Sequence, residues 1–537
     1  MYNKGLFADW VPKQLAPVLI IIFLLPILVV SGVYTGNLSY MVSSLGTHNE
    51  WIVFANYAGV VGMGVSLPII FRYKLRYHTK FLMVRTLVFL ALANIMIGTT
   101  ESNIVIVSSS FFIGFLKMFA LIEFIMPTMA MISPDGNRAK FYAIFYPSAI
   151  VFPQLAGYLM THFGFSTYWE NANFLMAIVL LSLAALAVIF MHNKRYDKKM
   201  SLKSIDWTGM FLYTSVFLAL AYLISFAKQQ NYFRSDNIML ALGIMIVGSI
   251  LYLINQQLKE SPFVHFGFFK NYSVIHGSLM LLMLGFFLAG SSLQSKITIG
   301  VLGFNSVMDN SFNLWMIPGL VLAIIFSMLW LVKEKSLKIY ILTGFSAFIF
   351  YYIFLYFLVS PGLSYDHLIL PNMLRGFGMA ILFIGVWLYA LGNLKPDAML
   401  GAAAVLIIVR TMIGPGLWSL AFNYIDGVWN LEAFTNMAGK MDASTMSHQT
   451  AMSYYKTIKL DALMISTKRI YGILVLLGGA VLVYVSFLNL EGLNKRGLVM
   501  LKKRLKRQDT EGYNREVQAI KTEEIEEEIK AVSAAAL

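Results

Sequence analysis

The sequence predicts an all-α polytopic membrane protein with fourteen transmembrane helices. Three observations lead to this fold class. The chain of 537 residues is 58% hydrophobic and only 13% charged, whereas about 25% of residues are charged in an average soluble protein. Its apolar residues form runs long enough to span a bilayer, and its lysines and arginines gather in alternate loops. A water-soluble domain could not bury this much apolar surface.

The predicted spans are apolar runs of about 20 residues, the length that crosses the hydrocarbon core. No A-x-A-like cleavage site follows the first run, so we interpret it as a retained helix and not as a signal peptide. The predicted spans lie near residues 15–39, 51–71, 81–98, 104–132, 140–161, 171–192, 206–226, 237–257, 275–295, 312–332, 338–360, 369–392, 398–424 and 470–490.

The distribution of basic residues predicts the orientation. Loops after even-numbered spans hold seventeen Lys and Arg residues, and loops after odd-numbered spans hold eight, five of them in one long loop, 424–469. Positive charge collects on the cytoplasmic side, and long loops weigh less in this rule. Both termini are therefore expected in the cytoplasm. The net charge of +14 is explained by this topology, and we expect no nucleic-acid partner.

A weak internal symmetry divides the predicted helices into two halves. "VFPQLAGYLM" in helix 5 and "RTMIGPGLWSLA" in helix 13 both place a proline among small residues. Helices 4 and 12 each hold a cation near a glycine, Gly114 with Lys117 and Arg375 with Gly376. The expected organisation is a six-helix bundle at 1–200, an inserted helix pair at 201–260, a six-helix bundle at 261–492 with a long outer loop at 425–469, and a cytoplasmic basic and acidic tail at 493–537.

Glu123, in "FALIEFIMPTMA", is the one acid deep within a predicted span. A charge at the centre of a spanning helix costs at least about 2.5–3.5 kcal/mol, so such residues are usually functional. Pro127 cannot donate to the carbonyl of residue 123, which opens the backbone beside this carboxyl. We interpret Glu123 as the proton-coupling residue. The alternative is a protonated acid that bonds to a neighbouring helix.

Three cations lie inside other predicted spans. Arg375 precedes Gly376 and Gly378, which would let a helix or a ligand approach closely, and Arg410 lies near the middle of helix 13. We expect Arg375, Arg410 and Lys117 to act as cavity or gating charges. The alternatives are an arginine that snorkels to the surface at Arg375 and a structural pairing with a carbonyl cluster at Lys117.

Several polar residues inside the spans are candidates for substrate binding in a central cavity. Each could instead form an ordinary interhelical hydrogen bond. They are Asn37, Gln154, Asn173, His276 and Gln294.

Most enzymatic chemistries are disfavoured. The chain has no cysteine and eight scattered histidines, so no metal site and no disulfide is expected. It has neither a G-x-x-x-x-G-K-[ST] phosphate loop nor a G-x-S-x-G nucleophile elbow. We therefore predict a protein that is not an enzyme, needs no cofactor and draws its energy from the proton gradient.

Several segments resemble the fourteen-helix drug:proton antiporters of the major facilitator superfamily, the EmrB/QacA branch. They are "SPFVHFGFFKNYSV" before helix 9, "LQSKITIGVLGFNSVMDNSFNLWMIPG" into helix 10, "LRGFGMAILF" in helix 12, "RTMIGPG" in helix 13, and "PQLAGYL" through "YWENANF" in helices 5 and 6. The resemblance covers roughly residues 15–490. It implies the major facilitator fold, two six-helix bundles plus two inserted helices.

The chain departs from this pattern where the family carries charges. Gly32 stands where family members have a helix-1 aspartate, and "FRYKLRYHTK" after helix 2 keeps only its bases. The helix-4 arginine is absent, with Lys117 the nearest substitute. These departures leave Glu123 as the remaining candidate for proton coupling.

The resemblance implies a secondary transporter in a bacterial inner membrane. We expect proton-coupled export of hydrophobic or amphiphilic small molecules by alternating access. In double-membraned bacteria the family often works with a periplasmic adaptor and an outer-membrane channel. The alternatives are an exporter or uniporter of a specific lipid, siderophore or metabolite in the same fold, and a membrane receptor or enzyme that keeps the scaffold.

Overall fold

The computed structural model describes residues 6–490 except 13, 134–137, 194–201, 203–204, 260, 334, 393, 395, 440–447 and 489. Within these residues the chain is helical, apart from one isolated bridge between Phe7 and Met191. Thirteen of the described helices are long and apolar enough to cross a membrane, and α2 (Leu15–Val29) is a shorter apolar helix. The predicted tail at 493–537 lies outside the described residues.

The first half of the bundle has its own hydrophobic core, which draws on residues from Leu6 to Met191. Phe23 of α2 and Phe124 of α6 stack inside it. The elements of this half are α2, η1 (Thr35–Asn37), α3 (Leu38–Leu45), α4 (Asn49–Arg76), α5 (Thr79–Thr99), α6 (Asn103–Ile132), α7 (Arg138–Ser166) and α8 (Trp169–Phe190).

The second half is packed around aromatic residues of α11, α14 and α15, and its core extends into α4 of the first half. Its elements are η4 (Phe266–Lys270), α11 (Tyr272–Gly300), α12 (Ser306–Ser311), α13 (Met316–Leu331), α14 (Leu337–Leu358), η5 (Asp366–Leu368), α15 (Ile369–Leu391), α16 (Pro396–Ile408), the π-helix η6 (Val409–Ile413), α17 (Gly414–Ala438) and α18 (His448–Phe487).

Two inserted helices, α9 (Trp207–Phe226) and α10 (Asp236–Leu258), lie between the halves in sequence, with η3 (Tyr232–Arg234) at their turn. α9 packs on α4, and α10 packs mainly on α9. Much of α10 exposes leucine and isoleucine, as expected of a lipid-facing helix. The carboxylate of Asp206 accepts hydrogen bonds from Gly209 N (2.9 Å), Asn255 Nδ2 (2.6 Å) and Phe263 N (3.3 Å). These bonds fix the ends of α9 and α10 to the linker that enters α11.

Two sequence predictions need correction. The predicted span at 15–39 is broken, because α2 ends at Val29 and helical structure resumes only at η1. The predicted outer loop at 425–469 is largely helical, because α17 continues to Ala438 and α18 already begins at His448. Both helical extensions contain polar residues, so a search for apolar runs did not detect them.

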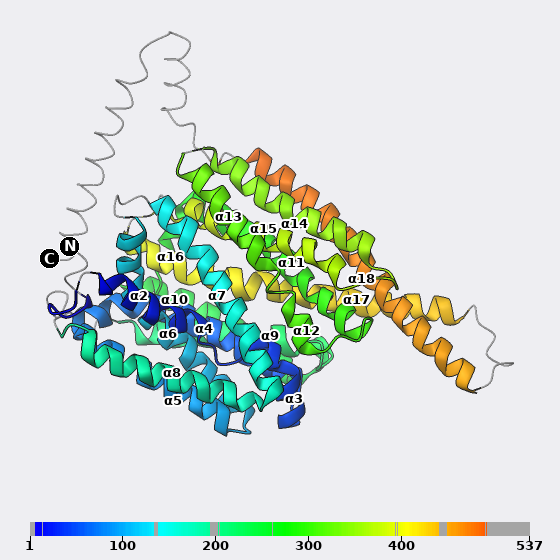
Figure 1. Ribbon diagram of the computed structural model, residues 1–537, viewed down its shortest axis with the longest axis horizontal. Coiled ribbons are helices and arrows are strands. Elements are labelled where there is room, and N and C mark those ends of the chain that lie inside the picture. The colour runs from blue at the N-terminus through cyan, green and yellow to red at the C-terminus, as the bar shows by residue number, and fades with distance from the viewer. Residues whose placement is uncertain are drawn as a thin grey trace, which may run out of the picture.

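Figure 1 shows how the halves meet. The blue to cyan helices of the first half gather on one side and the green to orange helices on the other, while the α17–α18 hairpin projects beyond the rest. α4 packs against α16, and α7 packs against α12, α13 and α15. We call this contact region the junction. Its two ends are the α12 end, which also carries α3, and the turn end, where α4 meets α5.

Gly64 lies where α4 crosses α16. A Cβ atom added at this position would approach Ile408 Cγ1 to 2.7 Å and the carbonyl oxygen of Ala404 to 3.3 Å. Glycine therefore permits the two halves to pack closely at this point.

We predict that Gly64→Leu separates α4 from α16 and lowers stability by about 1–3 kcal/mol, the usual cost of overpacking a filled interface. The measurement is the unfolding midpoint of the purified protein in detergent. The matched control is Gly243→Leu on α10, where nothing lies within 4 Å of an added Cβ. Equal midpoints for the two variants would contradict this account of the junction.

Candidate functional site

Arg410 lies at the junction, against aromatic residues of the second half that themselves pack on the first half. It is part of η6, the π-helix that precedes Pro415 in α17. The guanidinium lies 4.5 Å from the ring centre of Phe383 and 5.6 Å from that of Trp387, both on α15. Tyr146 of α7 interacts with it electrostatically and packs on Trp387 at 6.0 Å between ring centres. Single π turns inside helices are often found at functional sites.

The charge of Arg410 has little compensation from the protein. Among the described residues, it donates one hydrogen bond, from Nε to Thr411 Oγ1, which is long at 3.5 Å. Among the described residues, no carboxylate forms an ion pair with it. A cation–π contact contributes about 0.5–1 kcal/mol at an exposed site and about 2 kcal/mol or more when it is desolvated. Arg410 is half-buried at the junction, and its role as a cavity or gating charge stays a prediction.

A chain of hydrogen bonds joins the halves near the α12 end. Asn310 Nδ2 of α12 donates to Thr161 Oγ1 of α7 at 2.9 Å. Asn313 Nδ2 donates to Asn310 Oδ1 at 2.6 Å. Arg375 Nη2 of α15 donates to Asn313 Oδ1 at 2.6 Å. We call these four residues the α12 gate.

Further contacts surround the α12 gate. Ser39 of α3 and Ser306 of α12 share a hydrogen bond of 2.8 Å between their hydroxyls, which also joins the halves. Asn37 is buried on η1 and donates to the carbonyl of Met160 on α7 at 3.3 Å. Gln294 is buried in the second half and accepts from Tyr351 Oη at 2.9 Å. The predicted polar residue Asn37 thus belongs to η1, which packs on both α7 and α12 at the junction.

The glycines after Arg375 serve close helix packing. A Cβ added at Gly376 would lie 2.9 Å from Met316 Cα of α13, and one added at Gly378 would lie 2.9 Å from the carbonyl oxygen of Gly344 on α14. The sequence predicted that a helix or a ligand approaches closely at these glycines, and the structure shows neighbouring helices there.

Glu123 lies in the first half, near the turn end of the bundle. Its Oε2 forms an ion pair with Lys74 Nζ of α4 at 3.1 Å, and their side chains are 4% and 9% exposed. Breaking a buried ion pair by removing one partner costs about 3–5 kcal/mol. The sequence identified Glu123 and missed Lys74, which lies within "FRYKLRYHTK" and was assigned to a loop. α4 continues to Arg76 and carries Lys74 inside.

Lys117 compensates for the break in the first span. Its Nζ donates to the carbonyls of Leu28 (2.8 Å) and Val30 (2.9 Å), where α2 ends. Backbone polar groups in a membrane need such partners. Gly32, in the break itself, packs directly on Ser110 of α6, where an added Cβ would lie 2.9 Å from Ser110 Cα. This geometry favours the structural alternative for Lys117, the pairing with carbonyls.

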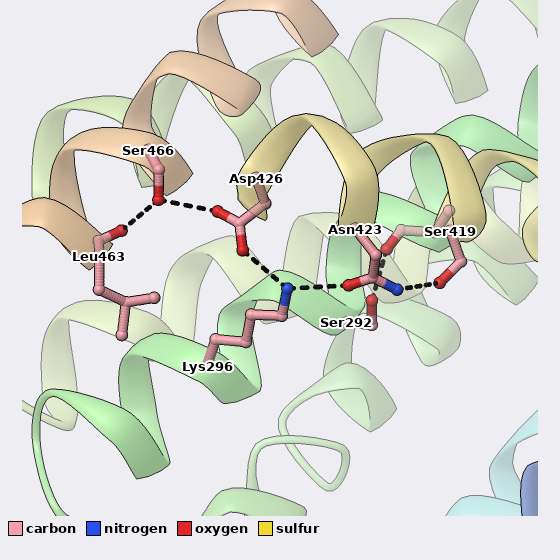
Figure 2. A network of polar contacts seen from close by, with 8 residues as sticks. Ser292, Lys296, Ser419, Asn423, Asp426, Leu463 and Ser466 are labelled. Carbon is pink, nitrogen blue, oxygen red and sulfur yellow. Dashed lines mark hydrogen bonds and ion pairs between the residues drawn. The ribbon is translucent and has the colours of Figure 1, made fainter. Parts of the chain in front are cut away.

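A second ion pair, missed by the sequence analysis, lies between α11, α17 and α18, with a half-buried lysine and a buried aspartate. Figure 2 shows Lys296 Nζ between Asp426 Oδ2 and Asn423 Oδ1, each at 2.9 Å. Ser466 Oγ donates to Asp426 Oδ1 at 2.8 Å. The Asp426 side chain is 9% exposed. Asp426 was overlooked because the predicted span ended at residue 424. This network fixes the α17–α18 hairpin to α11.

The remaining polar candidates occupy different places. Gln154 is half-buried on α7 and shares a helical stripe with Tyr146 and Thr161, at spacings of eight and seven residues. Asn173 is buried on α8, inside the first half. His276 Nδ1 bonds to Tyr484 Oη at 2.6 Å, between α11 and α18. The structure therefore brings Gln154 to the junction and places Asn173 and His276 away from it.

Comparisons with known proteins agree with the fold. No protein-family model matches the chain. It is 22% identical over 291 residues to the multidrug export protein EmrB of Escherichia coli K12, which covers 52% of this chain and 54% of that protein. The chain thus matches about half the length of this curated relative.

Two solved structures share the overall arrangement. A POT family transporter in complex with 5-aminolevulinic acid has a TM-score of 0.52 and 16% identity, covering 86% of this chain and 96% of its own. The D323A mutant of the nucleoside transporter NupG has a TM-score of 0.51 and 12% identity, covering 87% and 99%. The chain has the major facilitator fold. The proteins named here are all transporters and not enzymes.

We predict that Lys117→Met lowers stability by about 2–5 kcal/mol, because the carbonyls of Leu28 and Val30 lose their donor in a buried site. The measurement is the unfolding midpoint in detergent. The control is Lys228→Met, which removes an exposed lysine. A midpoint for Lys117→Met equal to that of the control would show that the broken helix does not depend on this lysine.

Proposed function

We propose that this protein is a secondary active transporter that works by alternating access across the junction. The observation that carries the proposal is the α12 gate, because Thr161 and Asn310 join the two halves through a polar contact. A hydrogen bond between side chains contributes about 0.5–1.5 kcal/mol net, so such contacts can break and re-form as two rigid bundles rock. The fold shared with solved transporters supports this mode of action.

The proposed cargo is a hydrophobic or amphiphilic small molecule that is exported from the cytoplasm. The similarity to EmrB, a multidrug export protein, supports this direction and cargo. The distribution of Lys and Arg supports an orientation with the turn end in the cytoplasm. We place the protein in a bacterial inner membrane, where a periplasmic adaptor and an outer-membrane channel are possible partners at the α12 end.

The proposed coupling ion is a proton carried by Glu123. Within the part of the chain that the structure describes, its carboxylate pairs with Lys74 on the neighbouring helix α4. Protonation would neutralise the carboxylate and abolish its attraction to Lys74, so α4 and α6 would be free to shift. Because α4 packs on α16 across the junction, such a shift would reach the second half of the molecule.

A second candidate function is uncoupled transport, or export of one specific lipid, siderophore or metabolite. The packing of Gly32 favours it, because no side chain fits between the broken first span and Ser110. The acid that related antiporters carry in helix 1 therefore has no room in this arrangement.

The gate is tested by cross-linking the variant Thr161→Cys/Asn310→Cys. The chain contains no cysteine, so an oxidant can form only the intended disulfide. We expect oxidation to stop transport of fluorescent amphiphiles in proteoliposomes and reduction to restore it. The probes are cationic ethidium, neutral phenylnaphthylamine and anionic anilinonaphthalene sulfonate.

The matched control is Thr47→Cys/Asn103→Cys, a pair within the first half whose native side chains hydrogen-bond at 3.0 Å. Oxidation of this pair should leave transport unchanged. If the Thr161–Asn310 cross-link forms and transport continues, the two halves do not separate at the α12 gate and the proposed mechanism is wrong.

For coupling, we predict that Glu123→Gln abolishes uptake driven by a pH gradient and retains exchange of substrate across the membrane without a gradient. The reason is that glutamine keeps the size of the side chain but cannot carry a proton. The measurement is the initial rate of probe uptake with and without the gradient. The control is Glu432→Gln, which changes a carboxylate that is 50% exposed. Unchanged gradient-driven uptake in Glu123→Gln would eliminate Glu123 as the proton carrier.

A further inference from the structure

We infer that Arg410 and the aromatic rings around it form a binding site for an organic anion. The ligand would be an amphiphile with a carboxylate, sulfonate or phosphate group attached to an apolar or aromatic body. The binding site is inferred from geometry alone. The idea that this site binds the transported substrate rests on the proposed function. It narrows the proposed cargo from amphiphiles in general to anionic amphiphiles.

The unused hydrogen-bonding capacity of Arg410 is the first observation. A guanidinium has five N–H donors in a planar fork. In this structure Nε has one long contact to Thr411, at 3.5 Å, and the terminal nitrogens donate to none of the described residues. The fork geometry matches the two oxygens of a carboxylate, sulfonate or phosphate group. An anionic group would therefore supply the partner that the described residues do not.

Four other cations on the described helices are satisfied by the protein, and Arg410 differs from them. Each of the four has a carboxylate, a carbonyl or an amide oxygen within 3.1 Å. These pairs are Lys74 with Glu123, Lys117 with the carbonyls of Leu28 and Val30, Lys296 with Asp426 and Asn423, and Arg375 with Asn313. Among the described residues, four cations have such partners, and no carboxylate forms an ion pair with Arg410.

The aromatic neighbours supply the apolar part of the site. Phe383 and Trp387 lie against the guanidinium, at 4.5 and 5.6 Å. Stacking on a ring face holds the planar group in place and leaves the N–H donors at its edge available for a ligand. The same rings and Tyr146 would contact the hydrophobic body of a bound amphiphile.

The site is built from both halves of the molecule. Arg410, Phe383 and Trp387 belong to the second half, and Tyr146 belongs to α7 of the first half. A ligand held between them would interact differently with the two halves when they separate. A ligand shifts a conformational equilibrium only through such a difference in affinity.

The experiment measures binding of two probes that differ in one charged group. Anilinonaphthalene sulfonate and phenylnaphthylamine share the same aromatic body, and only the first carries a sulfonate. Equilibrium dialysis against the full-length protein in nanodiscs, corrected with empty nanodiscs, gives both affinities. We expect the wild type to bind the sulfonate at least about tenfold more tightly, as a charge-assisted bidentate contact implies.

The variants Arg410→Gln and Arg410→Lys test whether Arg410 causes the preference for the sulfonate probe over the neutral probe. We expect Arg410→Gln to lose about tenfold or more in affinity for the sulfonate, Arg410→Lys to retain part of it, and both to bind phenylnaphthylamine as the wild type does. The matched control is Arg469→Gln, which removes an arginine that is 46% exposed on α18. The Arg469→Gln control should bind both probes with the affinities of the wild type.

Two results would overturn the inference. One is equal affinity of the wild type for the two probes. This result does not depend on whether any variant folds. The other is an unchanged preference for the sulfonate in Arg410→Gln. Sulfonate binding that depends on Arg410, in a protein that transports no probe in proteoliposomes, would support the site while contradicting the proposed transport function.

Discussion

The need to provide each buried charge with a partner determines much of this structure. An ion in an apolar interior loses its hydration, so it must pair, accept hydrogen bonds or reach water. Lys74 and Glu123 satisfy one another between α4 and α6, and Lys296 and Asp426 do so between α11 and α17. These pairs lie within single halves and tie neighbouring helices together. Arg410 lies between the halves and has no equivalent partner among the described residues.

The broken first span shows the same constraint acting on the backbone. When α2 ends inside the bundle, the carbonyls of Leu28 and Val30 lose the donors that a continuing helix would supply. Lys117 of α6 donates to both. Gly32 lets the irregular segment lie directly against Ser110. A lysine and a glycine thus make a helix break stable in a place where lipid offers no hydrogen bonds.

The contacts between the halves differ in kind along the junction. At the α12 end, side-chain amides and hydroxyls form the gate from Thr161 to Arg375. Near Gly64 the contact is apolar and close. Around Arg410 it is aromatic and charged. The proposed alternating access needs contacts between the halves that can exchange with water or ligand, and the junction has such contacts in its polar and charged regions.

The sequence by itself determined the fold class, the spans and the presence of buried charges. Apolar runs reveal membrane helices because length and hydropathy are local properties, and Glu123, Arg375 and Arg410 are visible because a charge in such a run is conspicuous. Local patterns could not show that Lys74 reaches Glu123, that α17 carries Asp426 inward, or that His276 and Asn173 lie away from the junction. Those facts depend on helix packing. Tertiary structure alone decided that Lys117 is satisfied by carbonyls and that Arg410 is not satisfied by an anion, because a charge finds its partner in space and not along the chain.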